Sequence, residues 1–264
     1  MKRLLLYLHV TITSMKKLLL PLCLLMLLSC SKKDPEPSVI IDSPTLDLKY
    51  DQQHEFKLKK GAEDIFPSTF NWVSSDEKVG KVDANGLFKS RKIGKATITG
   101  TSKEGGSSVI SDIVVSPYTS FIVEPSVEFG ATKQTIKSQE KRSLATESTD
   151  VILFDDSDPL IRFIGYLFEN GRCTSSVVIF ENTTRAVEQA GTFYKERYPE
   201  HGVIDDGVLG FISDARTHSV MMSVSDQIGF NALYFPYDEG GRVSGVSVRQ
   251  AKEILANTIQ NSHN

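Results

Sequence analysis

The chain has 264 residues, of which 40% are hydrophobic and 24% are charged, and its formal net charge is −3. This composition is typical of a folded protein, and the length is enough for one or two domains with hydrophobic cores. Acidic residues outnumber basic ones, whereas a nucleic-acid-binding protein needs clustered lysine and arginine, so the sequence argues against nucleic acid as a partner.

The first 29 residues have the pattern of a targeting segment. Met15-Lys16-Lys17 is followed by an apolar run from Leu18 to Leu28 and then by the small residue Ser29. The run has about eleven residues, fewer than the roughly 20 that a membrane-spanning helix needs. This order predicts a signal peptide over residues 1–29. Residues 1–14 hold a weaker run of the same kind, so we place the start of translation at Met15.

Leu27-Leu28-Ser29-Cys30 resembles the lipobox of bacterial lipoproteins. In that family the cysteine sulfur receives a diacylglyceryl group, the signal is cleaved before the cysteine, and the new amino terminus is acylated. The resemblance implies that Cys30 is lipidated and that the chain's partner is a membrane, held through several acyl chains. The alternative is an ordinary secretory signal that contains a cysteine.

Processing at Cys30 would change the charge and the cysteine content of the chain. It removes four basic residues and no acidic ones, which leaves 26 basic against 33 acidic residues and a net charge of −7. Cys23 leaves with the signal and Cys30 carries the lipid, so no intramolecular disulfide can form. We expect Cys173 to be a small, half-buried strand residue, because the sequence shows no base beside it.

Residues 30–37 form a polar, proline-bearing tether, which we expect to stay extended and to reach roughly 20 Å. Ser31, rather than aspartate, follows the cysteine, which in lipoproteins of two-membrane bacteria implies the outer membrane. Lys32-Lys33-Asp34 is the one feature that favours surface display. We therefore predict an outer-membrane lipoprotein of the cell envelope and leave open whether it faces the periplasm or the cell surface.

Residues 38–116 have the pattern of an all-β domain. Apolar and polar residues alternate in Leu46-Asp47-Leu48 and in Ala96-Thr97-Ile98-Thr99, as they do in half-buried strands. Asn85-Gly86 between two such runs predicts a tight hairpin. Short strands separated by turns predict a β-sandwich, with Trp72 in its core rather than on a ligand-stacking surface.

The segment from Trp72 to Phe88, followed by Gly94-Lys95-Ala96-Thr97-Ile98, is similar to the bacterial immunoglobulin-like (Ig-like) group 2 domain. It shares, in order, the tryptophan and the Ser-Ser-Asp, Asn-Gly-Leu and Gly-x-Ala-x-Ile landmarks of that family. The resemblance implies an Ig-like sandwich over residues 38–116. Such domains serve as spacers or binding modules in adhesins, cell-surface enzymes and glycan-associated lipoproteins.

Residues 117–264 predict an α+β domain. Helices are expected from Ala131 to Arg142 with Thr132 as N-cap, from Asn182 or Thr183 to about Arg197, and from Ser247 onward. Six strands are expected at residues 151–154, 160–169, 172–181, 208–214, 219–225 and 228–237, and Asn170-Gly171 predicts a hairpin. This grouping predicts an antiparallel sheet with helices on one face, and its order hints at a duplicated unit.

Two short segments of this domain are loosely similar to small outer-membrane lipoproteins with the β-lactamase-inhibitor-protein-like fold. Phe129-Gly130-Ala131-Thr132 resembles the Gly-x-Thr start of a helix there, and residues 165–171 resemble the Tyr-x-Phe-x-x-Gly strand that closes a hairpin. The chain lacks the Gly-x-Pro that usually ends the helix-loop in that group.

The sequence shows no catalytic or metal-binding pattern. His54, His201, His218 and His263 have no second histidine or cysteine at metal spacing, and His201 and His218 are expected on the solvated surface. Asp155-Asp156-Ser157-Asp158-Pro159 is interpreted as a turn rather than a calcium loop, which would need a glycine and a distant glutamate. We predict no enzyme activity, no cofactor and no metal; paired carboxylates for glycoside hydrolysis stay the alternative.

The predicted binding site is Tyr234, Phe235, Tyr237, Asp238 and Glu239. Strand alternation cannot bury all three rings on one face, and exposed rings beside carboxylates suit a sugar or a peptide. Packing of a strand end under the final helix is the alternative. The leading hypothesis is a lipid-anchored binding or adhesion protein with residues 38–116 as stalk and 117–264 as binding head for a surface protein or glycan. A periplasmic assembly or structural factor and a hydrolase of surface glycan or protein are the alternatives.

Overall fold

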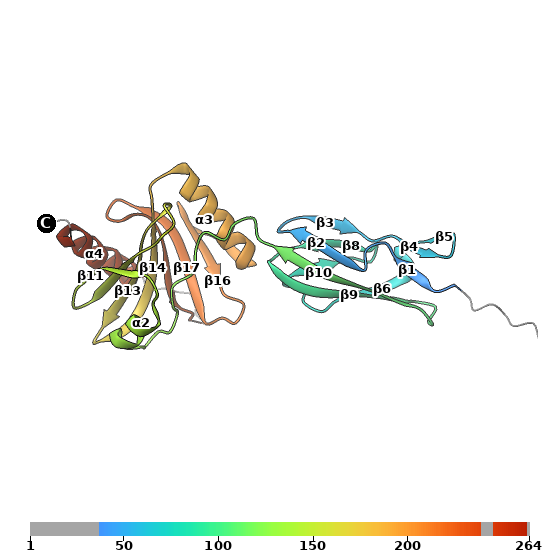
Figure 1. The fold of residues 1–264 in the computed structure, drawn as a ribbon, viewed down its shortest axis with the longest axis horizontal. Coiled ribbons are helices and arrows are strands. Elements are labelled where there is room, and N and C mark those ends of the chain that lie inside the picture. Colours follow the sequence, from blue (N-terminus) through green and yellow to red (C-terminus); the bar gives the residue numbers. More distant parts are fainter. Residues whose placement is uncertain (1–36, 239–244, 263–264) are drawn as a thin grey trace, which may run out of the picture. The chain divides into compact units, whose positions relative to one another are not determined.

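The computed structural model describes residues 37–238 and 245–262 (Figure 1). The predicted signal peptide, Cys30 and Glu239 lie outside these residues. No helix in the described part is long and apolar enough to cross a membrane.

The N-terminal domain, residues 37–116, consists of short strands. Its elements are β1 (Val39–Ile41), β2 (Thr45–Lys49), β3 (Gln53–Glu55), β4 (Leu58–Lys60), β5 (Glu63–Ile65), the 3₁₀ helix η1 (Pro67–Thr69), β6 (Phe70–Ser74), β7 (Gly80–Val82), β8 (Leu87–Ser90), β9 (Gly94–Ser102) and β10 (Ser108–Ser116). They form a four-stranded sheet, β2-β10-β9-β6, and two three-stranded sheets, β1-β4-β5 and β3-β8-β7. Every pairing is antiparallel except β2 with β10. The predicted all-β class is confirmed.

Alternation along the long strands builds the core of the N-terminal domain. Every second residue of the central part of β9 is buried, including Ile98, and these side chains pack with Phe56 and Phe88. Trp72 is partly buried, stacks on Phe56 with ring centroids 5.4 Å apart, and donates its indole N–H to the Pro67 carbonyl over 2.9 Å. The ring therefore contributes to packing, as predicted.

The predicted hairpin at Asn85-Gly86 joins β7 to β8. Gly86 has a φ of 78° and donates its N–H to the Asp83 carbonyl. A Cβ at Gly86 would lie 2.8 Å from the Pro67 Cβ, so both the backbone angle and the space require glycine.

In the C-terminal domain, the described residues 117–238 and 245–262 form one eight-stranded sheet and three helices (Figure 1). Its elements are α2 (Lys133–Gln139), β11 (Ser143–Glu147), β12 (Val151–Asp155), β13 (Ile161–Glu169), β14 (Arg172–Phe180), α3 (Thr184–Arg197), β15 (Glu200–Asp205), β16 (Val208–Ile212), β17 (His218–Ser225), β18 (Gly229–Pro236) and α4 (Gly245–Ser262). The strand order is β11-β12-β13-β14-β18-β17-β16-β15, and every pairing is antiparallel. Each half is thus a helix followed by a four-stranded meander, joined where β14 meets β18.

The local signals for helix starts and turns are confirmed. Thr132 and Thr183 are the N-caps of α2 and α3, and each hydroxyl accepts a backbone N–H of the first turn over 3.1 Å. Asn170 and Gly171 have φ angles of 50° and 73°, as a tight hairpin between β13 and β14 requires. In contrast, α2 ends at Gln139 rather than at Arg142, because Glu140 already has extended backbone angles.

The antiparallel sheet is as predicted, but the helices lie on both of its faces. Ile136 of α2 and Phe193 of α3 pack into one core, whereas Leu255 of α4 packs into a second core with Leu233 and Val177. The cause is visible in the sequence of β12, Val-Ile-Leu-Phe, all four of which are buried. A strand that is apolar on both sides needs a cover on both sides.

Candidate functional site

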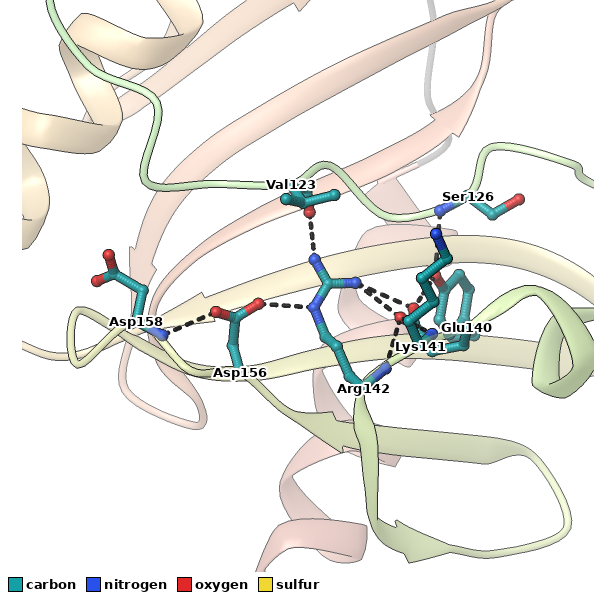
Figure 2. A network of polar contacts seen from close by, with 8 residues as sticks. Val123, Ser126, Glu140, Lys141, Arg142, Asp156 and Asp158 are labelled. Carbon is teal, nitrogen blue, oxygen red and sulfur yellow. Dashed lines mark hydrogen bonds and ion pairs between the residues drawn. The ribbon is translucent and has the colours of Figure 1, made fainter.

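A hollow of about 890 Å³ lies between the segment that precedes α2, the end of α2 and the loop after β12. Arg142 lines it, and its side chain is only 13% exposed. We call it the Arg142 hollow. Arg142 lies between two carboxylates, Asp156 and Glu140, below the carbonyl of Val123 in the view of Figure 2.

Three charged groups of this hollow, those of Arg142, Glu140 and Asp156, are paired with one another. Arg142 donates from Nε to Asp156 over 2.6 Å and from Nη1 to Glu140 over 3.0 Å, and Nη2 donates to the Val123 carbonyl. Burial disfavours the charge on Arg142, but the two carboxylates outweigh burial and raise the pKa of the guanidinium. The Tyr166 hydroxyl donates to Glu140 over 2.8 Å and accepts the Ser126 N–H over 3.0 Å.

This network joins three segments of the chain. It connects the carbonyl of Val123 and the N–H of Ser126 with the C-cap of α2 and the residue that follows β12. Its ionised groups are used for mutual stabilisation, so the arrangement is suited to holding the walls of the hollow in place. The turn that the sequence predicts at residues 155–159 thus contains Asp156, the ion-pair partner of Arg142.

A second polar cluster is buried against the face of the sheet that α3 covers. The Tyr198 hydroxyl donates to Glu124 and lies 3.0 Å from Nε2 of His218, and the hydroxyls of Tyr194 and Tyr234 are 2.7 Å apart. Burial raises the pKa of Glu124 and lowers that of His218. His218 is half-buried, so the expectation that it lies on the solvated surface is wrong: α3 and β18 pack their tyrosine rings against it.

A smaller hollow of about 430 Å³ lies on the other face, beside the region that α4 covers. Two of the predicted binding residues, Tyr237 and Asp238, line it. We call it the Tyr237 hollow. Its floor includes Gly202 and Gly210, which are directly paired between β15 and β16. Ile204 forms a wall, because a Cβ placed on Gly210 would lie 2.9 Å from the Ile204 side chain.

Tyr237 is held in place by a charged pair. Arg216 donates from Nη1 to the Tyr237 hydroxyl over 2.7 Å, and its guanidinium lies 5.5 Å from the centre of the ring. Its Nη2 donates to Glu200, another residue of the hollow, over 3.0 Å. These contacts fix the ring at the edge of a partly apolar surface, where its position is suited to ligand contact.

The structure divides the predicted binding site. Tyr234 is 0% exposed and belongs to the core under α3, and Phe235 is 6% exposed and belongs to the core under α4. The prediction that these two rings contact a ligand is therefore wrong, because both faces of β18 are covered. Tyr237 and Asp238 follow the end of β18 at Pro236 and line the hollow. Glu239 lies outside the described residues.

Sequence reasoning missed several residues of both hollows. Arg142 was expected as the last residue of a helix, and no element was predicted for Gly202 and Ile204, which lie in β15. Gly202, Gly210 and Ile204 form a hollow only because β15 pairs with β16, and the sequence did not predict this pairing.

Cys173 is 2% exposed in β14, and burial raises its pKa to about 11. The thiol is therefore protonated at neutral pH and packs as a small apolar side chain. It lies in a strand, as predicted, but it is buried rather than half-buried.

Comparison with known proteins identifies one part of the chain. No curated protein matches the chain. Among solved structures, domains 4–9 of the surface layer protein SbsC are similar at 13% identity and a TM-score of 0.26, with coverage of 80% of this chain and 28% of that chain. This similarity is too low to assign a shared fold. The resemblance of the C-terminal domain to β-lactamase-inhibitor-protein-like lipoproteins stays a prediction.

The model of the bacterial Ig-like domain (group 2) matches residues 37–113. The match coincides with the three sheets around Phe56 and Phe88, and a domain of this type indicates a non-catalytic cell-surface or structural role. Residues 37–113 are therefore a bacterial Ig-like domain of group 2.

Proposed function

We propose that this chain is a cell-envelope lipoprotein, anchored through Cys30, that binds a surface protein or glycan through its C-terminal domain. In this proposal the Ig-like domain is the stalk. The observation that carries it is the Tyr237 hollow, which presents an oriented aromatic ring beside an apolar floor and the carboxylates of Glu200 and Asp238. Such a combination of apolar surface with a few placed polar groups is typical of a binding site.

Binding is favoured over catalysis by the way the charged groups are used. In the Arg142 hollow, Arg142 donates hydrogen bonds to both neighbouring carboxylates, and the Tyr166 hydroxyl donates another hydrogen bond to Glu140. Within the described residues, no group of three or more His, Cys, Asp or Glu side chains is placed to hold a metal ion. The Tyr237 hollow therefore gives the more direct functional hypothesis.

The binding site is tested by replacing its aromatic ring. Tyr237→Ala in the full chain is expected to weaken binding to immobilised cell-surface proteins or to a glycan array by about tenfold or more, because it removes the oriented ring. Phe66→Ala is the matched control, since Phe66 is an aromatic residue of the Ig-like domain that is 77% exposed. Equal binding by both variants would contradict the proposal that the ligand binds at Tyr237. Turnover of a glycan or peptide substrate by the purified wild type would favour the hydrolase alternative over the binding function.

The anchor is tested separately on cells. Cys30→Ala is expected to abolish labelling with radioactive palmitate and to release the protein from the membrane fraction. A variant that stays with the membranes, or a wild type without label, would contradict lipidation. Protease treatment of intact cells then decides orientation: cleavage of the C-terminal domain supports surface display, and full protection supports the periplasmic alternative.

A further inference from the structure

We propose that β15 is an open sheet edge that binds an extended polypeptide by strand addition, with an apolar side chain of that polypeptide in the Tyr237 hollow. This inference rests on the proposed binding function of the C-terminal domain and names its ligand as a cationic, strand-forming peptide segment.

The edge itself is exposed along its whole length. β15 is the last strand of the sheet and pairs with β16, and all six of its residues are exposed. Val203 is 73% and Ile204 57% exposed, although both are apolar. An edge strand directs one row of backbone N–H and C=O groups away from the sheet, and another extended backbone satisfies this row in register. A glycan has no such repeating set of donors and acceptors.

The opposite edge of the same sheet shows how an edge is protected. β11 has a bulge in its middle, between Leu144 and Thr146. Glu147 at its end is held by Lys137 over 2.7 Å and by Lys133 over 3.8 Å, both from α2. Bulges and charged side chains are devices that prevent edge pairing. In β15 the register shift lies at Ile204, beside the hairpin turn, so Glu200–Val203 stay regularly paired.

The Tyr237 hollow lies next to this edge and is able to take a side chain from an added strand. Residues opposite one another on neighbouring strands have Cβ atoms about 5 Å apart and share one face of the sheet. A residue opposite Gly202 would meet no side chain there, and a Cβ built on Gly202 meets no atom within 4 Å. Its side chain would lie over Gly202 and Gly210, between Ile204 and Tyr237.

The charge around the edge selects the ligand. Glu200, Asp205 and Asp206 are exposed on β15 and on the turn after it. Arg216, which contacts Tyr237 and Glu200, carries a positive charge next to the hollow. Its charge is already paired with that of Glu200. Excess carboxylate favours a peptide that carries lysine or arginine between its apolar residues.

The probe is the acetylated and amidated peptide Lys-Val-Lys-Leu-Lys-Val-Lys, whose binding to the full chain is followed by fluorescence anisotropy. Its counterpart with glutamate in place of lysine is expected to bind at least about tenfold more weakly, because of the acidic edge. Two further copies carry N-methyl groups on one or the other alternating set of peptide nitrogens. Strand addition requires that one copy loses binding and the other keeps it, since only one set of N–H groups faces β15.

Two pairs of protein variants locate the site. Gly202→Leu fills the hollow and is expected to weaken peptide binding about tenfold, whereas Gly191→Leu on α3, where an added Cβ also meets no atom, leaves it unchanged within about twofold. Ile204→Lys places a positive charge on the open edge and is expected to weaken binding, whereas Leu144→Lys makes the same change on β11 without effect. Circular dichroism checks that each variant is folded. If Gly202→Leu does not fold, the comparison of Ile204→Lys with Leu144→Lys tests the site instead.

The outcomes separate this inference from the proposed function. Equal binding by both N-methylated copies, or equal binding by Gly202→Leu and Gly191→Leu, overturns strand addition. Glycan binding that depends on Tyr237 while the peptide fails to bind supports the proposed function and overturns this inference. If peptide binding is lost with only one of the N-methylated copies and is weakened by Gly202→Leu, the result supports both strand addition and the proposed binding function.

Discussion

His218 makes the stability of the C-terminal domain depend on pH. Burial lowers its pKa in the folded state, so below its ordinary value of about 6.5 the unfolded chain takes up the proton more readily than the folded one. The free energy of unfolding is therefore expected to fall as pH decreases below about 6.5, by at most about 1.4 kcal/mol per pH unit for this one group. Urea unfolding at several pH values between neutral and mildly acidic measures this slope.

A variant isolates the contribution of His218 from that of its neighbour Glu124. Burial raises the pKa of Glu124, which has the opposite effect: its contribution to stability is lost as pH rises above the carboxyl's unfolded value. His218→Gln removes the first slope and leaves the second. If the wild type and this variant lose stability in parallel as pH decreases, the buried histidine is not the cause.

At the level of single residues, the sequence predicted those features that local chemistry determines. Thr132 and Thr183 were found as helix caps, and Asn170-Gly171 as a hairpin, because each makes its hydrogen bonds or adopts its backbone angles within a few residues. Tyr198 contacts Glu124, which is 74 residues away in the sequence, and His218, which is 20 residues away. No spacing in the sequence carries that information.

At the scale of secondary-structure elements, the Arg142 network connects the segment before α2 with α2 and β12. Arg142→Ala would leave Glu140 and Asp156, which are 6% and 9% exposed, without their cation. Loss of one partner from a buried ion pair typically costs about 3 to 5 kcal/mol. We therefore expect a decrease of this size in the free energy of unfolding, measured by circular dichroism in urea.

Arg185→Ala is the control for this measurement. Arg185 is exposed on α3, and a surface substitution of this kind changes stability by about 0.5 kcal/mol or less. A loss equally small for Arg142→Ala would show that the network does not hold these elements together. Arg142→Lys, which keeps the charge but not the planar fork, is expected to lie between the two.

The elements that the sequence failed to predict are the two edge strands. The six predicted strands agree with β12, β13, β14, β16, β17 and β18 to within two residues at each end. β11 and β15 were missed because nearly all of their residues are exposed, so burial imposes no alternation on them. The position of α4 was also wrong, although the four buried residues of β12 contained the signal for a cover on both faces.

For the whole molecule, the Ig-like domain was predictable and the proposed binding site was predictable in part. The Ig-like landmarks follow one another along a single stretch of sequence, and the family match at residues 37–113 confirms them. A binding site was sought among aromatic residues of one strand end; of these residues Tyr237 and Asp238 line the Tyr237 hollow, and two others are core residues. Its floor comes from the pairing of β15 with β16, which no local pattern reveals.

In the proposed function, the Tyr237 hollow contacts a ligand when the protein is on intact cells. This contact is tested most directly by replacing Tyr237 with the photo-cross-linking amino acid benzoylphenylalanine and irradiating intact cells. We predict a covalent adduct of higher mass from position 237 and no such adduct from position 66, which is an exposed aromatic position of the Ig-like domain. Absence of an adduct at 237, or the same adduct from both positions, would contradict the claim.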